Sequence, residues 1–284
     1  MGRGEAYAHL PFLTQILEAP QSSHQSIANQ PVIINLHIST EAAADMASFH
    51  FRIRSGKKGA ALQHADYIAR RGRFSSREDL VQSIEGNLPE WTGGDRRVFW
   101  RASDKHERKN GASYRELVFA LPVELSMEQN IEIVQRCIQE FVQDRPYQAA
   151  VHAPMASLGR CANLHAHVMY SDRLPDGITR TPEQTFRRHN PRNPSAGGCK
   201  KASGGMNRAE LRKELVDKRR RCAEIQNHTL AKYGHETRVD HRALKDQGST
   251  RQPERNLGPA RVKRMTEEER TAFVQQHRGE RKSS

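Results

Sequence analysis

The stretch Asn163-Leu164-His165-Ala166-His167-Val168-Met169 carries most of the information about the fold. Apolar and polar residues alternate along it, which is typical of a half-buried β-strand. Side chains on a strand alternate between the two faces. His165 and His167 therefore point the same way, with Cα atoms about 6.6 Å apart, while Leu164, Ala166 and Val168 occupy the other face. Two imidazoles at this spacing can converge on one cation.

A third histidine, His152, ends the preceding strand-like segment, residues 147–152. If the two segments pair, His152 can complete a three-nitrogen site with open positions, a pattern of catalytic rather than structural metal sites. Two alternatives stay open. In a chain with 14 histidines, two of them can fall at this spacing by chance and be ordinary surface or core residues. A structural zinc site that includes Cys161 is the other alternative.

The remaining pattern predicts an α+β fold. Strands are expected at residues 49–54, 114–121, 147–152 and 164–171, and helices at residues 60–71, 126–144 and 207–233. Ser126 and Gln129 fit a capping box at the start of the middle helix. Residues 189–205 are rich in Pro, Gly, Asn and Lys and predict a long loop. This order of elements favours an antiparallel sheet with helices packed on one face.

The charge balance indicates a polyanionic partner. Lys and Arg number 46 against 33 Asp and Glu, which gives a net charge of +13. Nucleic acid is the commonest partner for such a surplus, and an anionic membrane is the second. No stretch approaches the roughly 20 apolar residues of a membrane span, so membrane insertion is not expected. The four cysteines form no C-x-x-C pair, which favours reduced thiols and a cytoplasmic protein.

The chain divides by composition into three parts. Residues 1–45 hold one basic and four acidic residues, unlike the basic remainder. We interpret them as an N-terminal extension, upstream of a natural start at Met46; a small cap that packs on the domain is the alternative. Residues 46–250 form the predicted domain. Residues 251–284 have little apolar content, which predicts a basic mobile tail.

Several separated motifs resemble those of the MobA/MobL relaxases, which belong to the HUH endonucleases. The segment from Asn163 to Met169, with Ser171-Asp172-Arg173 after it, is similar to the family's histidine signature. Ala65-Asp66-Tyr67-Ile68 and the following Arg71-Gly72-Arg73-Phe74 resemble its nucleophile segment. Further similarity lies in 114–126, 186–198 and 239–248. The resemblance covers roughly residues 46–260 and implies an antiparallel sheet of about five strands.

The resemblance also implies a reaction and its residues. Tyr67 would attack a DNA phosphodiester and form a 5′-phosphotyrosyl intermediate. A divalent metal, Mg²⁺ or Mn²⁺ with Zn²⁺ as a further candidate, would be held by His152, His165 and His167. Glu116 would orient Tyr67 or support the metal ligands. The basic residues expected to contact DNA are Arg70, Arg71, Arg73, Arg187, Arg188, Lys200, Lys201 and the run 218–221.

The expected role is to nick one strand at a plasmid transfer origin for conjugative mobilisation. The expected partners are single-stranded origin DNA, relaxosome accessory proteins and a type IV secretion coupling protein. The chain has no phosphate-binding G-x-x-x-x-G-K-[ST] motif, so a stand-alone relaxase, or one that relies on other proteins to unwind DNA, is expected. The alternatives are an HUH replication initiator or transposase with the same chemistry, or a non-catalytic zinc-containing DNA-binding protein that forms no covalent adduct.

Overall fold

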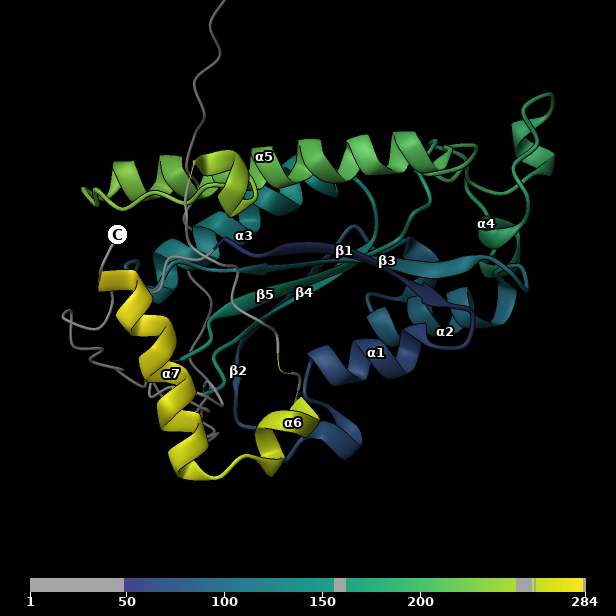
Figure 1. Ribbon diagram of the computed structural model, residues 1–284. Helices are drawn as coiled ribbons and strands as arrows, with labels where there is room; N and C mark the ends of the chain where they lie inside the picture. The colour runs from purple at the N-terminus through teal and green to yellow at the C-terminus, as the bar shows by residue number, and fades with distance from the viewer. Residues whose placement is uncertain (1–48, 156–161, 249–256, 258, 283–284) are drawn as a thin grey trace, which may run out of the picture. The chain divides into compact units, whose positions relative to one another are not determined.

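The central feature is a five-stranded sheet in which every neighbouring pair is antiparallel. The computed structural model describes residues 49–155, 162–248, 257 and 259–282. The strands lie in the order β1-β3-β5-β4-β2 (Figure 1). Their bounds are β1 Phe51–Lys57, β2 Leu80–Gly86, β3 Ala112–Ala120, β4 Tyr147–His152 and β5 His165–Tyr170.

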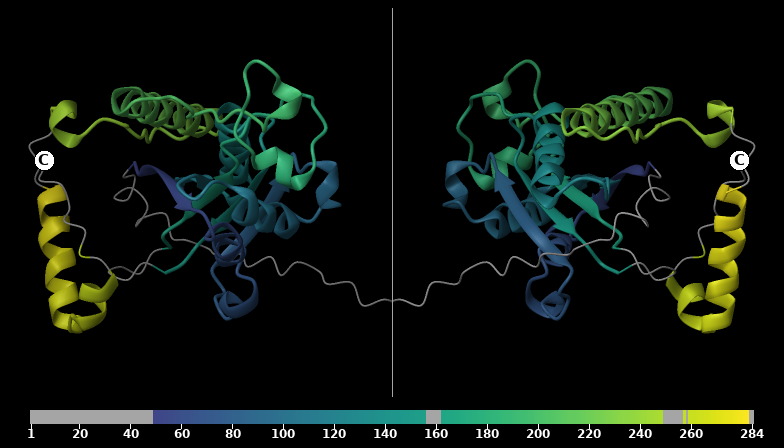
Figure 2. Two further views of the ribbon diagram at one scale, coloured as in Figure 1. Left: turned by 90° about the vertical axis from the view of Figure 1, so that its right-hand side faces the viewer. Right: turned by 90° about the vertical axis from the view of Figure 1, so that its left-hand side faces the viewer.

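Helices cover both faces of this sheet, as Figures 1 and 2 show. On one face α3 (Met127–Phe141) and α5 (Arg208–Lys232) pack over a core that includes Val134, Phe141 and Leu230. On the other face α1 (Ala61–Ile68) and α2 (Arg96–His106) form a second core around Ile68 and Trp100. The predicted α+β class and the antiparallel sheet are confirmed. The expectation that helices lie on one face only is wrong.

The two-sided packing explains the burial of the middle strands. In β3, seven consecutive residues from Ser113 to Phe119 are buried, because α5 lies over one face and α2 over the other. Alternation survives where one side is open, as in the edge strand β2. The capping box of Ser126 and Gln129 at the start of α3 is confirmed.

Two elements, β2 and α2, escaped the sequence pattern. Helix α2 begins with two arginines and has only a short apolar stretch, yet it buries Phe99, Trp100 and Ala102. Asp95 starts it by accepting a hydrogen bond from the Arg97 amide, which is an ordinary N-cap. Strand β2 reads as a mixed polar segment because it lies at the sheet edge and only one of its faces is half-buried.

Two buried arginines organise the long segment after β5. The Arg173 guanidinium donates to the carbonyls of Phe186, Arg187 and Cys199, and that of Arg180 donates to the carbonyls of Gly197 and Pro194. These bonds satisfy backbone groups that no sheet or helix can reach. The short α4 (Pro182–Phe186) comes before the predicted loop, residues 189–205, and one 3₁₀ turn (Pro194–Ala196) lies within it.

Part of the predicted tail is helical, with α6 at Pro259–Arg264 and α7 at Glu267–Lys282. Its mobility stays a prediction. None of the described helices is both long enough and apolar enough to cross a membrane. Cys137, Cys199 and Cys222 are free thiols. The N-terminal extension, residues 1–45, and Cys161 lie outside the described residues.

Candidate active site

Pairing of β4 with β5 brings the three predicted histidines together. His152 lies directly opposite His165, and His167 lies two residues further along β5 on the same face. The three ring centroids are 5.0 to 5.5 Å apart. One ligand atom from each ring lies within 4.8 Å of the others. The spacing therefore suits a single cation bound between the three rings.

Each ring has one nitrogen engaged by an oxygen acceptor. His165 Nδ1 lies 2.7 Å from the Asn163 carbonyl, and His167 Nδ1 lies 2.7 Å from Glu116 Oε1. His152 Nε2 lies 2.7 Å from the Ile68 carbonyl. A ring that donates through one nitrogen keeps a lone pair on the other, and metal-binding histidines are held in this way. This leaves His165 Nε2 and His167 Nε2 for a metal, whereas His152 Nδ1 lies 3.3 Å from Arg70 Nη2, so metal binding by His152 would require this contact to be given up.

Burial also favours the neutral imidazoles that metal binding requires. It lowers the pKa of His152 to about 4 and also lowers the pKa of His165, because charging a group away from water is unfavourable. At neutral pH a metal would not have to displace protons from these two rings. The spacing of the three rings and the neutral state of His152 and His165 fit a divalent metal.

Glu116 lies behind His167 on the neighbouring strand β3 and is buried. Its Oε1 is 2.7 Å from His167 Nδ1 and also 2.7 Å from His64 Nε2 on α1. Burial alone would raise the pKa of Glu116, but the hydrogen bonds from His167 and His64 lower it to about 2. Two roles were predicted for Glu116, orienting Tyr67 or supporting a metal ligand. Its position fits the second, because the carboxylate accepts hydrogen bonds from His64 and His167.

Tyr67 is half-buried on α1, and the end of this helix is hydrogen-bonded to strand β4, which carries His152. Gln148 of β4 donates to the Ala65 carbonyl at 2.9 Å, next to the bond between His152 and Ile68. The Tyr67 ring lies in an aromatic and basic setting. The Phe74 ring is edge-on to it at 5.2 Å, and Arg77 Nη1 lies 3.5 Å from the hydroxyl. Tyr67 is therefore carried by the helix that contacts the histidine cluster.

Arg70 holds this region together and is buried, contrary to its predicted place on a DNA-binding surface. Its guanidinium forms two hydrogen bonds with Asp79, at 2.6 and 2.8 Å, and donates to the Tyr67 carbonyl at 2.7 Å. It also lies over the Tyr67 ring and 3.3 Å from His152 Nδ1. With its donors used internally and only 8% of its surface exposed, Arg70 connects Tyr67 with His152 rather than facing solvent.

Comparison with known proteins settles the family. The MobA/MobL family model matches residues 55–268, well over half of the chain. The chain belongs to the MobA/MobL family. Over 210 residues it is 43% identical to the 43 kDa relaxation protein of Salmonella typhimurium, a match that covers 73% of this chain and 57% of that protein. Over 221 residues it is 36% identical to Mobilization protein A of Escherichia coli, covering 75% and 30% of the two chains.

This member of the MobA/MobL family thus matches less than two thirds of the length of these relatives. A solved structure described as the molecular basis of vancomycin resistance transfer in Staphylococcus aureus has a TM-score of 0.52 and 18% identity, covering 69% of this chain and all of that one. At this identity the likeness concerns the fold alone. It agrees with the antiparallel sheet and its helices.

The other basic residues predicted to meet DNA separate into two groups. Arg71, Arg73, Arg188 and Lys200 are exposed, and Arg187 is exposed beside Glu183. Lys201 is not free to contact DNA, because its Nζ lies 3.1 Å from the buried Glu107 and donates to the Ala112 carbonyl.

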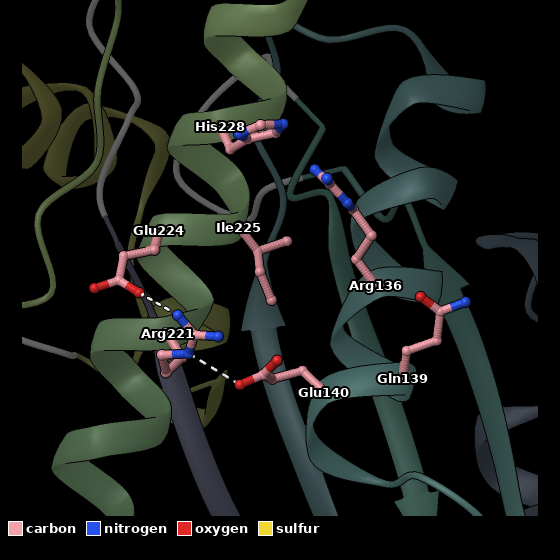
Figure 3. A pocket seen from close by; sticks show the side chains of 7 residues that line it. All are labelled: Arg136, Gln139, Glu140, Arg221, Glu224, Ile225 and His228. Carbon is pink, nitrogen blue, oxygen red and sulfur yellow. Dashed lines mark hydrogen bonds and ion pairs between the residues drawn. The ribbon is translucent and has the colours of Figure 1, made fainter.

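The run 218–221 on α5 also serves the fold, which its charge alone did not indicate. Lys218 pairs with Glu214, and Arg219 donates to the carbonyls of Phe51 and His241. Arg221 bridges Glu140 and Glu224 in a groove of about 480 Å³ between α3 and α5 (Figure 3). Helices α3 and α5 cover one face of the sheet (Figure 1), whereas His152 contacts α1 on the other face, so the groove is remote from the histidine cluster. Its lining residues are Arg136, Gln139, Glu140, Arg221, Glu224, Ile225 and His228.

Sequence reasoning missed His64, Arg77 and Asp79, all of which contact a predicted site residue. A signal existed for His64, since it precedes Tyr67 by three residues and so shares a helix face with it. No sequence signal indicated the contact of Asp79 with Arg70, because an irregular segment after α1 separates the two residues.

Proposed function

We propose that this chain is a relaxase that nicks one DNA strand at a plasmid transfer origin and remains covalently attached to it. The arrangement of the candidate nucleophile carries the proposal. Tyr67 is on a helix whose terminal carbonyl binds His152, one of three clustered histidines. The two relatives, a relaxation protein and a mobilisation protein, support the same function.

The reaction would be a transesterification at one phosphodiester. The Tyr67 oxygen bonds to phosphorus as the bond from phosphorus to the 3′-oxygen breaks. The tyrosyl hydroxyl gives up a proton and the leaving 3′-oxygen gains one, so protons balance. One phosphate ester replaces another, and a later 3′-hydroxyl can therefore reverse the step without an added energy source.

His152, His165 and His167 would hold the divalent metal, for which Mg²⁺ and Mn²⁺ are the first candidates and Zn²⁺ the third. When bound, it would polarise the scissile phosphate and offset its negative charge, a contribution of several kcal/mol in metal-assisted reactions. Glu116 would keep His167 in the orientation and tautomer that ligation needs. Arg77 would neutralise negative charge near the Tyr67 oxygen.

The test is a search for the covalent adduct. A single-stranded oligonucleotide library spanning the transfer origin of the chain's own genetic element is incubated with Mg²⁺ or Mn²⁺ and run on a denaturing gel. We expect an adduct that disappears in Tyr67→Phe and after chelation. Tyr233→Phe is the matched control, since this exposed tyrosine at the end of α5 binds Glu132; it should leave the adduct intact.

Other outcomes separate the alternatives. Tight, salt-sensitive binding with no adduct at any origin site would contradict the proposal and favour a zinc-containing DNA-binding protein. An adduct formed at a replication origin or transposon end, but not at a transfer origin, would indicate an initiator or transposase. The relaxosome accessory proteins, the secretion coupling protein and the cytoplasmic location belong to the same proposal and follow from the transfer-origin role.

A further inference from the structure

Strand β1 extends the histidine-bearing face of the sheet to an open edge. Directly opposed residues on neighbouring strands share a face. Arg52 lies opposite Val118, which lies opposite His167. Arg54 lies opposite Glu116. The side chains of Arg52 and Arg54 therefore belong to the same face as the candidate metal ligands.

These two arginines are exposed, and no other described residue binds them by a hydrogen bond or an ion pair. This sets them apart from Arg70, Arg115 and Arg173, whose donors are used inside the fold. Glu116, the carboxylate opposite Arg54, is already engaged by His64 and His167. Within the described part of the molecule, two full positive charges thus face solvent beside the site.

The geometry suits an extended polyanion. Neighbouring strands are about 4.8 Å apart, so Arg52 is roughly 10 Å from His167 across β3, and Arg54 follows about 6.7 Å further along β1. On this face helix α1 contacts β4 through Gln148 and His152 and β3 through the bond between His64 and Glu116. Helix α5 contacts β1 from the opposite face, through Arg219 and the Phe51 carbonyl. The arginines can therefore reach a strand that runs from the histidines toward the β1 edge.

We propose that Arg52 and Arg54 form a phosphate-binding strip for the single DNA strand next to the histidine cluster. The proposal rests on the proposed relaxase function and adds to it a part of the binding surface on β1. Such contacts position the strand and carry no sequence information. Each phosphate contact on a single strand contributes about 0.7 to the slope of log affinity against log salt concentration.

The test measures binding of a fluorescein-labelled oligothymidylate to the full chain by fluorescence anisotropy across a salt series. For Arg52→Gln/Arg54→Gln we expect the slope to fall by about 1.4, which corresponds to binding roughly tenfold weaker at about 0.15 M salt. Arg52→Lys/Arg54→Lys should keep the slope. The matched control is Arg212→Gln/Lys213→Gln, which removes two exposed charges from α5 and should change little.

Circular dichroism should show the same thermal unfolding for all variants, because the substituted residues are exposed. An unchanged slope in the glutamine variant, with the wild type binding and forming its adduct, would overturn the strip and leave the proposed function standing. An equal fall in the α5 control would also overturn it, since the effect would then reflect net charge alone. Failure of the wild type to bind the oligothymidylate would overturn the strip, while the proposed nicking at a transfer origin would still be decided by the adduct gel.

Discussion

Replacing Glu116 with Gln tests whether this carboxylate supports a metal ligand. The substitution keeps the shape of the side chain and removes the charge that accepts hydrogen bonds from His167 and His64. Those bonds lower the pKa of Glu116 from 4.5 to about 2. A shift of this size corresponds to about 3 kcal/mol of interaction with the carboxylate form.

Part of that interaction should appear as metal affinity. Removing a partner of a metal-bound histidine typically weakens metal binding by about 10- to 100-fold, or roughly 1.4 to 2.8 kcal/mol. The interaction of about 3 kcal/mol at the Glu116 carboxylate is large enough to account for such a loss. Isothermal titration of the metal-free protein with Mn²⁺ measures the change directly. His64→Gln removes one of the two bonds and leaves the carboxylate on His167, so its effect should be smaller.

Glu214→Gln is the matched control, because Glu214 is a half-buried acid that binds Arg115 and Lys218 on the other side of the sheet. It should lower stability without changing metal affinity. If Glu116→Gln binds Mn²⁺ as tightly as the wild type, the reasoning about His167 is refuted. If the Glu214 variant loses as much affinity, the effect is one of general stability.

Two further predictions concern the region around Tyr67. Asp79→Asn leaves the buried Arg70 without its charged partner and should lower the free energy of unfolding by about 3 kcal/mol in urea denaturation; Glu183→Gln, which removes an exposed pair, should change it by well under 1 kcal/mol, and equal losses would count against the assigned role of Arg70. The pKa of His152 is about 4 in the folded metal-free protein against about 6.5 when unfolded. Its contribution is therefore constant above pH 6.5 and is lost as the pH falls toward 4, by up to about 3 kcal/mol; chelated protein should show this decline, and a His152→Gln variant with the same slope would contradict it.

The histidine cluster was predictable because it depends on one local rule and one pairing. Alternation placed His165 and His167 on one face, and the antiparallel partner strand placed His152 beside them. The candidate nucleophile was different, since nothing in the spacing of Tyr67 relates it to β4. Its location depends on how α1 packs, and the prediction came from family resemblance.

The errors concern charge and edges. The sequence around Arg70 reads as a basic patch, but whether an arginine faces solvent depends on its partner. The partner of Arg70 is Asp79, and the fold of the irregular segment between them, which brings the two together, is not evident from the sequence. Lys201 was misjudged for the same reason, because Glu107 is distant in sequence. Strand β1 was predicted from its alternation, but alternation within one strand does not show which strand it pairs with. Only the register places Arg52 and Arg54 in line with the histidines.

The end of helix α1 has a consequence for how substitutions at the histidines should be interpreted. Helices ordinarily leave their last carbonyls without partners. Here the Ile68 carbonyl accepts a hydrogen bond from His152 of β4, and the Ala65 carbonyl, which already accepts one from the Ala69 amide, accepts a second from Gln148. His152 is thus a candidate metal ligand, and it also holds the last turn of the helix that bears Tyr67 through a hydrogen bond. A loss of nicking in a His152 variant would therefore combine two defects, one in metal binding and one in the orientation of Tyr67. His165, anchored on its own strand's loop carbonyl at Asn163, is the position where ligand loss can be observed by itself.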